Sequence, residues 1–81
     1  MAFEQYLIDQ GQSPDIVDES TPNITYIGWC DPGTQSTLEP KFKIKRIETA
    51  LGITKTFWAN GEKQTDKIWD NRATYTYTFL K

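Results

Sequence analysis

The chain has 81 residues, a formal net charge of −2, 14% aromatic residues, one cysteine and no histidine. This length allows one domain with a small core, and the aromatic content is too high for a disordered protein. A single cysteine excludes an internal disulfide framework and, without histidine, leaves no recognisable set of transition-metal ligands. No apolar run approaches the ~20 residues that cross a bilayer. We therefore expect no metal, no cofactor and no membrane partner.

Charge is divided along the sequence. Residues 1–40 hold seven acids and no base, a formal −7, whereas residues 41–81 hold nine bases and four acids, a formal +5. Opposite charges of this kind guide partner choice and register. The division predicts pairing between the two halves, either within one molecule or between neighbouring copies.

Residues 1–22 differ from the rest of the chain and predict an extended N-terminal arm, followed by a β domain over residues 23–81. The arm opens with an apolar patch and continues into an acidic stretch that ends at Pro22. The spacing within the patch also fits one or two turns of helix, which would be marginal in isolation. We expect the patch to dock on another subunit through Phe3, Tyr6, Leu7 and Ile8.

The first two strands of the domain are expected over residues 23–29 and 41–45. The first is rich in β-branched and aromatic residues, and turn residues follow it at 31–33. The second alternates apolar and basic residues. The alternation then reverses, with Arg46 on the inward phase and Ile47 on the outward phase, so either a bulge intervenes or the second face is also covered.

Two further strands are expected over residues 53–59 and 73–80. The pair at residues 60–61 is Asn-Gly, which favours a type I′ hairpin turn. Residues 66–71 could form a helical turn capped by Asp66. The predicted fold is all-β, either a small antiparallel sandwich or a partly open barrel of four or five strands.

Charged and aromatic side chains give the candidate sites. The spacing of Asp66 and Asp70 could suit a glycosidase, but turn formation explains both acids better. A basic stripe is the expected docking surface for the acidic arm, and because the chain is acidic overall we do not expect nucleic-acid binding. The stripe comprises Lys41, Lys43, Lys45 and Arg46.

Most aromatic residues must form the core of so small a domain, although exposed rings could instead stack on sugars. Arg72 could stack on Trp69 or pair with a carboxylate, which would fix the start of the last strand. We therefore expect structural roles for Trp58, Trp69, Arg72, Tyr75 and Tyr77.

Five segments in order give the chain a family resemblance. They are Tyr26-Ile27-Gly28, Asp31-Pro32-Gly33-Thr34, the strand at residues 42–47, Trp58-Ala59-Asn60-Gly61 and residues 68–77. This pattern resembles a group of small tailed-bacteriophage proteins that are virion-associated or fused to phage structural polypeptides. The match covers residues 23–79, with Phe42 standing where a Trp is usual, and the acidic arm lies outside it.

The resemblance implies a non-enzymatic virion structural component, such as a capsid decoration or a tail, neck or fibre part. Its partners would be other virion proteins and copies of itself. The alternative is a carbohydrate- or receptor-binding module on the virion surface. We expect synthesis in the host cytoplasm, because the first residues lack the basic flank and apolar run of a signal peptide.

Overall fold

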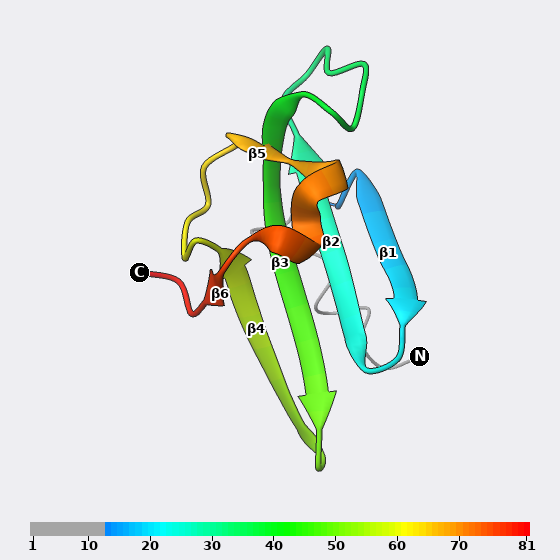
Figure 1. Ribbon diagram of the computed structural model, residues 1–81, viewed down its shortest axis with the longest axis vertical. Coiled ribbons are helices and arrows are strands. Elements are labelled where there is room, and N and C mark those ends of the chain that lie inside the picture. The colour runs from blue at the N-terminus through cyan, green and yellow to red at the C-terminus, as the bar shows by residue number, and fades with distance from the viewer. Residues whose placement is uncertain (1–12) are drawn as a thin grey trace.

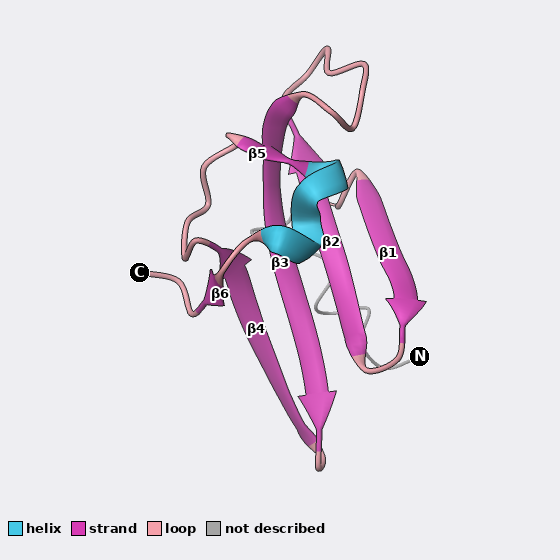
Figure 2. Ribbon diagram, viewed as in Figure 1, coloured by secondary structure: helices cyan, strands magenta, loops and turns pink. Residues whose placement is uncertain are grey.

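The structure is a computed structural model that describes residues 13–81 (Figure 1). Strands account for most of the regular structure, and one short 3-10 helix lies near the C-terminal end (Figure 2). The elements in chain order are β1 (Ile16–Thr21), β2 (Ile24–Cys30), β3 (Pro40–Ala50), β4 (Ile53–Ala59), β5 (Lys67–Ile68), the 3-10 helix η2 (Trp69–Thr74) and β6 (Tyr77–Thr78).

All six strands belong to one open antiparallel sheet, which confirms the predicted all-β class. The strand order is β1-β2-β3-β4-β6, and β5 pairs with β3. One edge of β3 is shared, because its start pairs with β5 and the rest pairs with β4. The four long strands and the two-residue strands β5 and β6 form a single sheet that does not close into a barrel.

The predicted boundary between an arm and a domain at residues 22–23 is wrong. Strand β1 pairs with β2 from Ile16↔Gly28 to Thr21↔Ile24, so residues 16–21 belong to the sheet. Asn23 adopts a φ of 64° in the tight turn, a conformation that Asn tolerates better than most residues. This turn returns the acidic stretch along β2.

The apolar patch of the predicted arm falls outside the described residues. The docking role expected of this patch stays a prediction; its residues are Phe3, Tyr6, Leu7 and Ile8.

Both faces of the sheet carry buried apolar side chains. On the face that holds η2, the buried cluster is Tyr26, Phe42, Ile44, Ala59 and Trp69. On the opposite face, the buried cluster is Ile27, Trp29, Ile47 and Trp58. The β2–β3 register is continuous from Ile24↔Glu48 to Cys30↔Phe42. Ile47 points outward from the first face because the second face is also buried, and not because of a bulge.

The strand predicted over residues 73–80 is wrong, since only Tyr77–Thr78 pairs with β4. The tyrosine hydroxyls bond to backbone groups nearby: Tyr75 Oη accepts the Ile68 N–H at 2.7 Å, and Tyr77 Oη donates to the Arg72 carbonyl at 2.7 Å. These bonds favour a compact turn instead of an extended strand. The predicted cap is also wrong, because Ile68 occupies the N-cap of η2 and Asp66 pairs with Lys67.

Trp69 packs directly against the sheet at Gly28. Trp69 is 3% exposed, and a Cβ added at Gly28 would lie 2.8 Å from two ring carbons of Trp69 and from Ile16 Cγ2. No real Cβ tolerates such distances. The glycine is therefore required by the close approach of the indole to β2, and this contact holds η2 on the sheet (Figure 1).

We predict that Gly28→Ala destabilises the fold by about 1–3 kcal/mol through overpacking, measured by urea unfolding. Trp69→Ala should remove about 3–5 kcal/mol, close to the whole ~5 kcal/mol of a domain of this size. The milder Trp69→Leu, which replaces the indole with a smaller apolar side chain, therefore serves as the second background. The cost of Gly28→Ala should shrink in that background. An unchanged cost would show that the indole does not impose the glycine.

Candidate protein-contact surfaces

Arg72 joins three elements of the fold. Its Nε and Nη2 donate to Asp18 Oδ2 on β1 at 2.9 and 2.8 Å, and its Nη1 donates to the Trp69 carbonyl at 3.1 Å. Its Cζ also lies 4.8 Å from the Trp69 ring centroid and 5.9 Å from that of Tyr26 on β2. The guanidinium thus makes both interactions that the sequence left open, a ring stack and a carboxylate pair.

The carboxylate of Asp18 receives hydrogen bonds on both oxygens. The Ser20 hydroxyl and backbone N–H donate to Oδ1 at 2.6 and 2.9 Å. The Ser20 bonds and then the Arg72 guanidinium outweigh burial and lower the pKa of Asp18 from 3.8 to about 2. The carboxylate form of Asp18 is therefore more stable, relative to the protonated form, in the folded protein than in the unfolded chain.

We predict that this carboxylate contributes an acid-dependent part of the stability. A folded-state pKa below the unfolded value stabilises the protein fully above about pH 4. That contribution is lost as the pH falls toward about 2. Asp18→Asn should lower the urea midpoint at neutral pH and flatten its decline between these values. Glu19→Gln, the same charge change on an exposed side chain of β1, should keep the wild-type slope. Equal slopes in wild type and Asp18→Asn would contradict the assignment.

A second surface lies on the face opposite η2, where lysines cover two stacked tryptophans. The Trp29 and Trp58 ring centroids are 6.0 Å apart at an interplanar angle of 25°. Lys43 Nζ lies 5.2 Å from the Trp29 centroid, and Lys63 Nζ lies 5.3 Å from that of Trp58. Lys45 Nζ lies over both rings, at 5.5 and 4.9 Å. We call these five residues the lysine–tryptophan face.

The register of the sheet builds this face. Trp29 lies opposite Lys43 in the β2–β3 pairing, and Trp58 lies opposite Lys45 in the β3–β4 pairing. Lys41, two residues before Lys43, has the same phase and is exposed. The basic stripe predicted from the sequence included neither Trp29 nor Lys63. Shared strand phase could have linked Trp29 to the lysines, whereas Lys63 reaches the face from a loop and has no local signal.

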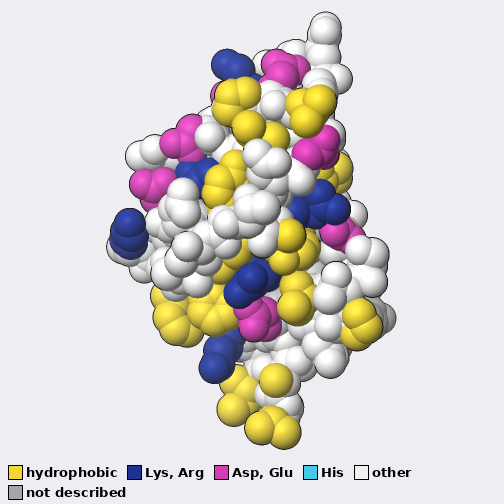
Figure 3. Space-filling view, in the orientation of Figure 1, with side chains coloured by type: hydrophobic (Ala, Val, Ile, Leu, Met, Phe, Trp, Pro, Cys, Tyr) yellow, Lys and Arg dark blue, Asp and Glu magenta, His cyan; other side chains and the backbone are white. Residues whose placement is uncertain are grey.

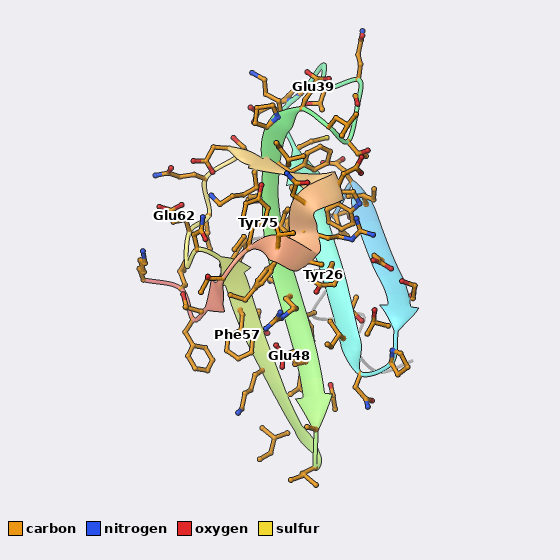
Figure 4. All side chains as sticks on the ribbon, viewed as in Figure 1. Tyr26, Glu39, Glu48, Phe57, Glu62 and Tyr75 are labelled. Atoms are coloured by element: carbon orange, nitrogen blue, oxygen red, sulfur yellow. The ribbon has the colours of Figure 1, made fainter. Side chains whose placement is uncertain are left out.

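Arg46 does not belong to the predicted basic stripe. Side chains alternate along a strand, so Arg46 points to the face that carries η2. There its Cζ lies 4.5 Å from the Tyr77 ring centroid and 5.8 Å from that of Phe57, and its Nη2 pairs with Glu48 Oε2 at 2.5 Å. Figure 4 shows Tyr26, Glu48 and Phe57 on this near side of the sheet.

The acids that suggested a glycosidase are used differently. Asp66 and Glu62 both pair with the Lys67 ammonium, whose side chain is 4% exposed. Burial alone would lower the pKa of Lys67, but the hydrogen bonds to the two carboxylates outweigh it and raise the pKa. Asp66 therefore compensates a buried cation.

The tryptophans are also unsuited to stack on a sugar. All three in the sequence are buried, at 1%, 4% and 3% exposure for Trp29, Trp58 and Trp69. A carbohydrate platform needs an open ring face. Burial of the three tryptophans leaves the carbohydrate-binding alternative without an exposed tryptophan ring.

Over residues 13–81, no three potential metal-ligating side chains from His, Cys, Asp and Glu form a cluster. In the same part of the chain, no helix has the length and apolar character to cross a membrane. No family model matches the chain, and searches of curated proteins and of solved structures found no similar protein.

Proposed function

We propose that this chain is a structural module of a tailed-bacteriophage virion, acting through protein–protein contacts with neighbouring virion proteins and with copies of itself. The ordered residue pattern from Tyr26 to Tyr77 supports this class, and so does the small all-β fold. The role is one of assembly and not of catalysis.

The lysine–tryptophan face is the observation that carries the proposal. Its three lysine side chains lie over the rings of Trp29 and Trp58, which are only 1% and 4% exposed, so a partner would meet this face mainly through the lysines, and a protein segment with acidic side chains suits it. Ile27 and Trp29 on this face are 0% and 1% exposed, although η2 packs on the other face. Apolar side chains buried this deeply offer no open ring face, which favours contact with a polypeptide over reversible binding of a small ligand.

The chain itself contains a segment of this chemistry. Residues 1–12 include Glu4 and Asp9 among apolar side chains and contain no base. Within the proposal, this segment binds the lysine–tryptophan face of its own copy or of a neighbour. Exchange between copies would link subunits in an assembly.

We predict that association of the full chain is guided by charge and weakens with salt. Exposed charges are screened beyond ~8–10 Å at ordinary ionic strength. Lys43→Glu should mainly slow association between immobilised and free protein, measured by surface plasmon resonance at low and high salt. Lys45 is 7% exposed, so its reversal would perturb the fold and is avoided.

Lys81→Glu is the control for this prediction, since it makes the same charge change at an exposed residue outside the face. It should associate at nearly the wild-type rate. An association rate that is the same at low and high salt, or equal slowing by both variants, would contradict guidance by the lysine–tryptophan face.

The virion assignment is tested by particle composition. Phage particles from a host that produces this chain would be banded in a density gradient and analysed by mass spectrometry. The proposal expects the chain at a fixed ratio to the major structural proteins in the particle band. Its recovery only in the soluble lysate would overturn a virion role.

A further inference from the structure

Two isoleucines on the face opposite η2 are buried, although no helix or strand of residues 13–81 covers them. Ile27 and Ile47 are 0% and 5% exposed. All six strands lie in the sheet, and η2 packs on the other face. The lysines of this face lie over Trp29 and Trp58 instead. A further segment is therefore needed to cover the isoleucines.

The neighbours of Ile47 in the sheet are too small to bury it. Thr25 lies opposite Ile47 in the β2–β3 pairing, and Thr56 lies opposite it in the β3–β4 pairing. By contrast, Ile53 has the strand phase of the face that carries η2, lies beyond the helix and is 58% exposed. Figure 3 shows hydrophobic side chains at the surface there. An isoleucine of this sheet is thus buried only where another segment packs on it.

We infer that residues 1–12 fold back over the lysine–tryptophan face of their own copy and cover Ile27 and Ile47. This inference rests on the proposed function of that face as a polypeptide-binding surface, and it names the occupant of the face in a free copy. A neighbouring copy binds the face only after the segment has left it. The segment therefore controls when the face is open for assembly.

The start of the described chain lies beside this face. The Asp15 N–H donates to the Gly28 carbonyl at 2.9 Å, so the chain reaches the sheet next to Trp29. Along β3, the distance from Lys43 to Ile47 is about 13 Å, whereas twelve residues span about 18 Å even as a helix. The segment is therefore long enough to cover the face of its own copy.

The composition of the segment matches the face. Phe3, Tyr6 and Leu7 supply apolar side chains for the isoleucines, and Glu4 and Asp9 supply carboxylates for the lysine ammonium groups. A segment joined to its site by a short connection has an effective concentration in the millimolar range. At lower protein concentrations it therefore outcompetes the same segment of a neighbouring copy.

The reactivity of a thiol placed beside Ile47 tests this cover in the full chain. Thr56→Cys supplies the thiol, and Cys30→Ser removes the native one. The rate of alkylation by iodoacetamide should rise about threefold or more when Tyr6→Ser/Leu7→Ser removes two apolar side chains from the segment, because the cover then opens more often.

Thr54→Cys is the matched control. Thr54 has the same strand phase as Thr56 but is exposed, so its thiol should react at the same rate with and without the two serine substitutions. Equal rates at Thr56→Cys with and without these substitutions would overturn the inference and, with it, binding of the segment to this face.

Protein concentration separates this inference from the proposed function and needs no change in the segment. The Thr56→Cys thiol should be protected equally in dilute and concentrated protein, because the cover comes from the same copy. Protection that grows with concentration would show that a neighbour supplies the cover. That result would overturn the inference and leave the proposed function standing.

Discussion

Packing of the Trp69 indole on Gly28 is the contact on which the arrangement of the fold depends. The helix η2 has six residues, and a 3-10 helix this short is not stable by itself. It stays on the sheet because the indole packs against Gly28 of β2 and because Arg72 stacks on the indole while pairing with Asp18 of β1. The Arg72–Asp18 pair thereby ties η2 to β1. One face is thereby closed by the protein's own C-terminal segment.

Because η2 covers one face of the sheet, the burial of side chains on the opposite face needs a separate explanation. A sheet from so short a chain can bury little apolar surface, yet here both faces carry a buried cluster. Asp18 from the acidic half of the sequence pairs with Arg72 from the basic half within one molecule, so one of the expected contacts between the two halves is intramolecular. The lysines of the opposite face lie over the buried rings of Trp29 and Trp58. The proposed assembly role places a polypeptide partner on this face.

The elements predicted correctly from the sequence are those set by local alternation and turn residues. Strand β4 was expected over residues 53–59 and occurs there, because alternation and the flanking turns agree. Strand β1 was missed because its acidic composition hid its pairing with β2. The predicted strand over 73–80 failed because tertiary hydrogen bonds from Tyr75 and Tyr77 replace strand pairing. Arg72 was singled out, but no local pattern could indicate a partner 54 residues away.

The central claim is that this chain works by repeated contact with neighbouring protein subunits. An electron cryomicroscopy map of complete virions that contain the chain tests it most directly. The account predicts a regular array in which the lysine–tryptophan face lies against a polypeptide segment. A map that places the chain with this face open to solvent, or that has no ordered density for it, would contradict the account.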